Sequence, residues 1–168
     1  EIIVLSNNVD KTSKQYNVKA INRWDIKEIY KAIKQSDLLI SGGGSLLQDV
    51  TSNKTVPYYL LIIKIAKVLK KEVVFYSQGY GPVNKWHNQK MVQHILNKVE
   101  HIFVRDRNSK KELIKIGVKS NIIVSADPVI GMELDKNINV LEKLNVSSSK
   151  IKIGIYLRPW KNDSILQE

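Results

Sequence analysis

Cysteine is absent from the 168-residue sequence. This absence excludes disulfides, thiolate nucleophiles and cysteine-ligated metals, and it is typical of a cytoplasmic protein. Long apolar runs are missing as well: the longest, at 56–63, is interrupted by Lys64 and is far too short to cross a bilayer. A hydrophobic fraction of 43% still supplies enough apolar side chains for a buried core. The composition therefore indicates a folded domain and not a disordered segment.

Arginine is scarce even though the formal net charge is +11. Only four of the 27 basic residues are arginines, namely Arg23, Arg105, Arg107 and Arg158. Arginine is the usual residue for planar phosphate and base-edge recognition, whereas the lysines here are scattered over predicted helix faces. The charge thus favours a solvated surface over a nucleic-acid partner, and attraction to an anionic membrane surface or a polyanionic glycan stays open.

Short apolar segments alternate with amphipathic ones, which predicts a parallel α/β sheet. We expect strands at 2–6, 37–41, 72–77, 101–105 and 121–125, and helices at 25–35, 56–70, 86–99 and 106–116. The predicted strands are continuously apolar, as in sheets that helices cover on both faces. The fold class is therefore a Rossmann-like parallel sheet with helices on both faces.

The alternating pattern becomes irregular after Pro128. A short helix is expected at 136–144, followed by the serines at 147–149 and a fresh strand at 151–157. We therefore expect an N-terminal Rossmann-like domain over 1–146, a linker at 147–150, and the start of a second Rossmann-like domain at 151–168.

Two glycine-rich loops directly follow predicted strands. Glycines leave backbone N–H groups uncovered, which favours an anion or a sugar hydroxyl, and ligands of open α/β folds bind at this carboxyl edge of the sheet. A helix close to the first loop would place Ser45 and Asp49 about one helical turn apart. Tight structural turns would explain both loops equally well. The candidate substrate-binding residues are Gly42, Gly43, Gly44, Ser45, Asp49, Gln78, Gly79 and Gly81.

Two further strands deliver charged residues to the same edge. Arg105 is a candidate cation for a ligand, whereas the adjacent Asp106 is better explained as a helix N-cap. Asp127 is a candidate carboxylate, although Asp127 and Pro128 could also form a simple turn. The convergence of four strand ends is the strongest indication of a site. The histidines, His87, His94 and His101, have no carboxylate at ligand spacing, so no metal is expected.

Six segments, in order and over nearly the whole chain, resemble the polysaccharide pyruvyl transferase family, most closely its CsaB-type cell-wall enzymes. These segments are SGGGSLLQDVTS (41–52), VPYYL (56–60), YSQGYGP (76–82), VRDRNS (104–109), ADPV (126–129) and IYLRPW (155–160). The resemblance implies a GT-B-like fold of two Rossmann-like domains with the active site in the cleft between them.

The resemblance also implies an activity. Pyruvate would pass from phosphoenolpyruvate, the donor substrate, to N-acetylmannosamine of a cell-wall polysaccharide or its lipid-linked precursor, forming a ketal. The product would anchor S-layer proteins. No cofactor is implied, and the enzyme would be cytoplasmic, in peripheral contact with the inner membrane face.

The resemblance places the catalytic residues in a C-terminal half that this sequence lacks, and it implies that the family's opening strand and glycine-rich turn are also missing. The fragment alone is therefore expected to be inactive. Arg158, at the end of the strand expected at 151–157, is suited to grip the carboxylate or phosphate of the donor as a bidentate fork. A nucleotide-sugar glycosyltransferase of GT-B fold and a non-catalytic glycan-binding module remain alternative functions.

Overall fold

The computed structural model describes residues 1–50, 52, 54–133 and 153–155. The chain divides into two compact units, Glu1–Met132 and Glu133–Glu168. The regular elements of the described residues belong to the first unit: β1 (Ile3–Ser6), α1 (Val9–Tyr16), β2 (Lys19–Asn22), α2 (Ile26–Gln35), β3 (Leu38–Gly42), α3 (Thr55–Val68), β4 (Glu72–Gln78), α4 (Trp86–Leu96), β5 (His101–Val104), α5 (Arg107–Lys115), β6 (Ile122–Val124) and the 3-10 helix η1 (Pro128–Gly131).

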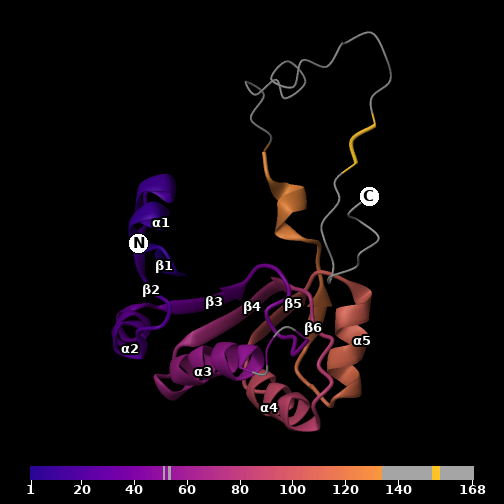
Figure 1. Cartoon of the computed structure of the whole chain (residues 1–168). Helices are drawn as coiled ribbons and strands as arrows, with labels where there is room; N and C mark the ends of the chain where they lie inside the picture. The colour runs from indigo at the N-terminus through magenta and orange to yellow at the C-terminus, as the bar shows by residue number, and fades with distance from the viewer. Residues whose placement is uncertain (51, 53, 134–152, 156–168) are drawn as a thin grey trace. The chain divides into compact units, whose positions relative to one another are not determined.

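The strands form two parallel sheets (Figure 1). One contains β1 and β2, and the other has the order β3-β4-β5-β6. Neighbouring pairs such as Leu38 with Glu72 and Ile102 with Ile122 set the register of the larger sheet. Because its strands run in one direction, their carboxyl ends meet at one edge. The predicted Rossmann-like α/β class is therefore confirmed.

Local sequence explains where two of the helices begin. The Asp25 carboxylate accepts hydrogen bonds from the backbone N–H groups of Lys27 and Glu28 at the start of α2. The Asp106 carboxylate caps α5 in the same way by accepting from the N–H of Ser109 at 2.7 Å. The N-cap interpretation of Asp106 is therefore confirmed.

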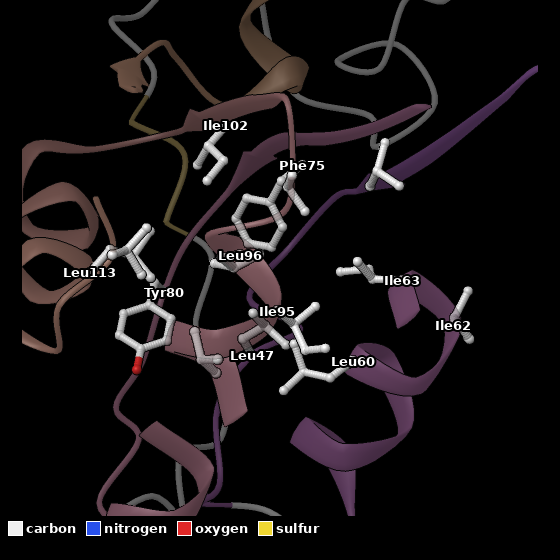
Figure 2. Packing of buried hydrophobic residues seen from close by; sticks show 14 of the residues in the cluster. Leu47, Leu60, Ile62, Ile63, Phe75, Tyr80, Ile95, Leu96, Ile102 and Leu113 are labelled. Atoms are coloured by element: carbon white, nitrogen blue, oxygen red, sulfur yellow. The ribbon is translucent and has the colours of Figure 1, made fainter. Parts of the chain in front are cut away.

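The core lies between the four-stranded sheet and the helices α3 and α4, which pack against each other on one face (Figures 1 and 2). Phe75 of β4 and Ile102 of β5 meet Ile63 of α3 and Leu96 of α4 there. All four side chains are fully buried. Burial of a side chain of this size contributes about 1.5–3 kcal/mol, so this layer holds the carboxyl edge in place.

Several boundaries differ from the sequence-based expectation. The sequence VDKTSKQY of α1 buries no side chain, and β2 has only four residues, so neither element showed a clear apolar period. A loop separates Gly44 from α3, so Ser45 and Asp49 do not lie on a helix, and the expected one-turn spacing is wrong. Residues 153–155 form no regular element; the rest of the strand expected at 151–157, the helix expected at 136–144 and the linker lie outside the described residues.

No helix within the described part of the chain is long and apolar enough to cross a membrane.

Candidate functional site

The two glycine-rich loops extend β3 and β4 beyond the ends of the strands and remain paired. The N–H of Gly79 donates to the carbonyl of Gly44 at 2.9 Å, and the N–H of Gly81 donates to the carbonyl of Leu47 at 2.9 Å. Gly43 and Gly44 have φ angles of +84° and +60°, a left-handed conformation that favours glycine. The sequence therefore places glycine where the chain must leave β3 and turn back beside the second loop.

Arg105 lies at the centre of this edge, directly after β5. Its Nη2 donates to Ser45 Oγ at 2.9 Å, and its Nη1 lies 3.4 Å from a carboxylate oxygen of Asp127. Its Nε is 3.6 Å from Asp106 Oδ2. Both carboxylate distances exceed the 2.7–2.9 Å typical of strong charge-assisted bonds, and 34% of the side chain is exposed. The guanidinium N–H groups are therefore accessible to an anionic ligand.

Gly79 makes this arrangement sterically possible. A Cβ atom at this position would lie 2.7 Å from Ser45 Oγ and 2.8 Å from both Nε and Nη2 of Arg105. Real side chains essentially never show contacts that short. We call Ser45, Gly79, Arg105 and Asp127 the Arg105 cluster; these four predicted residues come from the ends of four different strands.

Asp49 has a different environment. Its side chain is buried, and its carboxylate accepts hydrogen bonds from the N–H groups of Asn84 and Lys85 and from Nδ2 of Asn88 at 2.9–3.0 Å. Burial raises the pKa of Asp49, but the three hydrogen bonds outweigh burial and lower it below its ordinary value. Asp49 thus fastens the first glycine loop to the start of α4, and its predicted contact with substrate stays a prediction.

Gln78 is fully buried at the end of β4. Its Nε2 donates to the carbonyl and to Oγ of Ser41, and its Oε1 has no partner among the described residues. Gln78 therefore ties the carboxyl ends of β3 and β4 together from inside the sheet.

Sequence reasoning overlooked a pair of serines at the same edge. Ser77 Oγ and Ser125 Oγ are 2.8 Å apart, and Ser125 Oγ also donates to the carbonyl of Val104. Ser77 is buried and has a φ angle of +47°, which is uncommon for a residue other than glycine. It lies in an irregularity of the β4–β5 pairing, between Phe75 and Gln78, that no local sequence pattern announces.

Ser109 was also overlooked. Its hydroxyl accepts from the N–H of Tyr80 at 2.9 Å and donates to the Asp106 carboxylate at 3.0 Å. Hydrogen bonds from Ser109 are the main reason that the pKa of Asp106 lies below its ordinary value. The start of α5 is thereby fixed to the second glycine loop, next to the Arg105 cluster.

The other predicted residues lie around or outside this centre. Gly42, Gly43 and Gly81 shape the two loops, whereas Arg158 falls outside the described residues. Over the described ranges no three His, Asp or Glu side chains are grouped as a metal site would require. Among the described residues, the Arg105 cation converges with the Ser45 hydroxyl and with two partly exposed carboxylates, Asp127 and Asp106. Such a set is suited to binding an anionic group beside a hydroxyl-bearing molecule.

Comparison with known proteins yields one match. A family model described as polysaccharide pyruvyl transferase matches residues 1–167. No curated protein and no solved structure matches the chain.

Proposed function

The chain belongs to the polysaccharide pyruvyl transferase family, and from this premise we propose that the full-length protein transfers pyruvate from phosphoenolpyruvate to a sugar of a cell-wall polysaccharide. N-acetylmannosamine is the acceptor that we propose, as in the CsaB-type enzymes that the sequence resembles. The ketal would serve to anchor S-layer proteins, and the reaction would take place on the cytoplasmic side of the membrane.

The proposed reaction balances without a redox partner. The methylene carbon of the enol phosphate takes up a proton and becomes a methyl group. Two sugar hydroxyls form C–O bonds to the neighbouring carbon, and the C–O bond to phosphate breaks so that phosphate leaves with its electron pair. The two hydroxyls lose two protons in total: one balances the proton taken up by the methylene carbon, and the other is taken up by the phosphate. Such a reaction needs a general acid and fixed cations for the anionic donor.

The Arg105 cluster is the observation that supports this proposal. Arg105 offers a cation to the carboxylate or phosphate of the donor, and it is held in position by Ser45 Oγ. Asp127 lies close enough to orient the guanidinium and is exposed enough to accept a hydrogen bond from a sugar hydroxyl. The exposed backbone of the Gly42–Gly44 turn is suited to donate N–H groups to further oxygen atoms of either substrate. Arg158 remains our proposed second cation for the donor.

The net charge of +11 also suits the proposed acceptor. A basic surface attracts a polyanionic glycan and an anionic membrane surface alike, and a lipid-linked acceptor would present both.

The test is turnover by the full-length protein. It is incubated with phosphoenolpyruvate and an acceptor that ends in N-acetylmannosamine; released phosphate is assayed, and the glycan is analysed by mass spectrometry and NMR for a pyruvyl ketal. We expect phosphate and ketal in equal amounts, both abolished in Arg105→Ala. Glycan binding without phosphate release would instead identify a binding module. Turnover with a nucleotide sugar in place of phosphoenolpyruvate would identify a glycosyltransferase.

A further inference from the structure

A groove of about 360 Å³ lies between the second glycine loop and the helices α4 and α5. One side is formed by Gly81, Pro82 and Val83, another by Gln89 of α4, and the third by residues of α5. Small-molecule sites typically have volumes of about 300–1,000 Å³. The groove is therefore large enough for one small organic molecule.

Hydrogen bonds hold the loop side of the groove in place. The N–H of Tyr80 donates to Ser109 Oγ at 2.9 Å, and Nε2 of Gln89 donates to the carbonyl of Val83 at 2.7 Å. The first bond connects the loop to α5, and the second connects it to α4. Because both helices are fastened to the loop, the groove is formed before a ligand arrives, which lowers the entropic cost of binding.

The hydroxyl of Tyr80 is a buried polar group without a partner among the described residues. Tyr80 lines the groove and is only 7% exposed, and its Oη makes no hydrogen bond there. Figure 2 shows its ring at the border of the buried cluster, with the hydroxyl turned away from Leu113. Burial above all, and the charges of Glu112 and Asp49 as well, raise the pKa of this hydroxyl, so it stays protonated and can donate. A buried donor without an acceptor is costly, so the groove favours a ligand that accepts this bond.

Glu112 of α5 brings an acceptor to the same groove. Its side chain is 42% exposed, and its Oε2 lies 3.7 Å from Lys115 Nζ, farther than the roughly 2.7–2.9 Å of a strong charge-assisted bond. Among the described residues, none that lines the groove is Lys or Arg. An anion such as phosphoenolpyruvate is therefore unsuited to the groove, and the nearby Lys115 and the net charge of +11 disfavour a cation.

The remaining lining combines apolar side chains, those of Pro82, Val83 and Ile116, with the amide of Asn108. A purely apolar ligand would leave the Tyr80 hydroxyl without an acceptor. A hydroxyl group can both donate to a carboxylate and accept from a phenol, so a ring that carries several hydroxyls can satisfy both polar groups. The C–H groups of such a ring can pack on the apolar side chains. A neutral sugar ring has this combination of groups.

The groove adjoins the Arg105 cluster. Gly79 belongs to the cluster, and the next residue, Tyr80, lines the groove. Ser109, which accepts from the N–H of Tyr80, donates to the Asp106 carboxylate. That carboxylate in turn lies 3.6 Å from Nε of Arg105. A glycan with one sugar at the Arg105 cluster can therefore place a neighbouring sugar in the groove.

We propose that the groove between the second glycine loop, α4 and α5 is a subsite for a neutral sugar unit of the acceptor glycan, next to the sugar that receives the pyruvyl group. One ring hydroxyl accepts a hydrogen bond from Tyr80 Oη, another donates to the Glu112 carboxylate, and the C–H groups pack on Val83 and Ile116. The identity of the glycan rests on the proposed pyruvyl transfer, whereas the binding of a sugar does not. The subsite makes an acceptor of two or more sugars better than its terminal sugar alone.

Calorimetry with two probes tests the subsite in the full-length protein. The probes are N-acetylmannosamine and a disaccharide that ends in N-acetylmannosamine, both titrated without phosphoenolpyruvate. We expect the disaccharide to bind about tenfold more tightly, and Tyr80→Phe to weaken its binding by about 3–10-fold, the equivalent of one lost hydrogen bond. The affinity for N-acetylmannosamine should not change. Equal affinities of Tyr80→Phe and the unmodified protein for the disaccharide would overturn the proposal.

The melting temperature of the free protein separates sugar binding from a structural role of Tyr80. Tyr80→Phe removes a buried donor without a partner, so the melting temperature should stay the same or rise. Tyr30→Phe is the matched control, because Tyr30 lies 44% exposed on α2, and it should change neither stability nor binding. A lower melting temperature of Tyr80→Phe would show that the hydroxyl is bonded within the protein and would overturn the proposal.

Filling the groove is an independent test by kinetics. Asn108 and Lys111 are both exposed on α5, but only Asn108 lines the groove, so Asn108→Trp blocks it and Lys111→Trp is the control. We expect KM for the disaccharide to rise at least about tenfold in Asn108→Trp, with kcat/KM for N-acetylmannosamine within about threefold. Lys111→Trp should keep the preference for the disaccharide. The same preference in Asn108→Trp would contradict the subsite.

The subsite and the proposed pyruvyl transfer fail separately. Disaccharide binding that depends on Tyr80, without turnover of phosphoenolpyruvate, would contradict the transfer and support the subsite. Turnover of phosphoenolpyruvate together with disaccharide binding that does not depend on Tyr80 would support the transfer and overturn the subsite.

Discussion

Two charged residues at the carboxyl edge, Asp49 and Arg105, differ in their burial and in their hydrogen bonding. Asp49 lies in the loop that follows β3, Arg105 directly follows β5, and the sequence indicates both as ligand-binding candidates. The Asp49 carboxylate is 8% exposed at the residue level and accepts three hydrogen bonds, whereas the Arg105 guanidinium is one-third exposed and its carboxylate contacts exceed 3.3 Å. A saturated, buried charge stabilises the loop that it anchors, and a partly exposed, loosely paired charge can exchange partners for a ligand.

Gly79→Ala should have the largest effect, because it attacks the Arg105 cluster directly. The added Cβ would overlap Ser45 Oγ and two guanidinium nitrogens, so these side chains have to shift and their alignment changes. We expect kcat/KM of the full-length enzyme to fall by at least 100-fold, about 3 kcal/mol. Steady-state kinetics with phosphoenolpyruvate measure this change.

Gly131→Ala is the matched control. A Cβ at Gly131 meets no atom within 4 Å, and its backbone does not require glycine. Kinetics within threefold of the unmodified enzyme are expected. A similar loss in both variants would show that the edge tolerates no substitution and that Gly79 has no special relation to Arg105.

Asp49→Asn tests whether the Asp49 carboxylate stabilises the fold. An amide keeps the shape of the side chain but turns an NH2 group toward backbone or side-chain donors that now lack an acceptor. We expect a loss of about 2 kcal/mol in the free energy of unfolding, measured by urea denaturation, because leaving buried donors unpaired costs about 1–3 kcal/mol. A variant with unchanged stability but lost activity would return Asp49 to the list of substrate-binding residues.

The stability that Asp49 contributes should depend on pH. The folded-state pKa of Asp49 lies below its unfolded value of about 4, so its contribution is complete above pH 4 and is lost as the pH falls through the folded pKa. The difference in unfolding free energy between the unmodified protein and Asp49→Asn should therefore shrink from pH 5 to pH 3. A difference that stays constant over this range would contradict the assigned role.

Ser77→Gly should have the smallest effect and the opposite sign. Glycine relieves the left-handed conformation of Ser77, which costs about 1 kcal/mol for other residues. The variant also loses the bond to Ser125 Oγ, so we expect a stability change between zero and about +1 kcal/mol. Thermal unfolding measures it, and Ser77→Ala, which keeps the strain and loses the bond, is the control that should be destabilised.

The sequence predicted most of the larger sheet because its strands are continuously apolar and its helices amphipathic. The predicted Asp106 cap is confirmed because capping is a local interaction between residues three positions apart. By contrast, α1 and β2 were missed, since α1 buries no side chain and β2 is too short to show a period.

The candidate site was predictable as an edge but not as a set of contacts. Parallel topology alone brings the ends of β3 to β6 together, which correctly placed Ser45, Gly79, Arg105 and Asp127 near one another. Topology could not show that Asp49 anchors the loop, because the Asn88 amide that donates to its carboxylate lies 39 positions away and reaches it only once α4 has packed. The conformation of Ser77 likewise depends on how β4 pairs with β5.

The central claim is that Arg105 binds the anionic donor and that Asp49 holds the loop. Arg105→Lys and Asp49→Asn in the same full-length enzyme test it most directly, with kcat/KM for phosphoenolpyruvate and the melting temperature measured for both. Lysine keeps the charge but not the fork, so Arg105→Lys should lose about 2 kcal/mol in kcat/KM at an unchanged melting temperature. Asp49→Asn should lower the melting temperature and leave kcat/KM of the folded enzyme within threefold. A loss below threefold for Arg105→Lys would contradict the account.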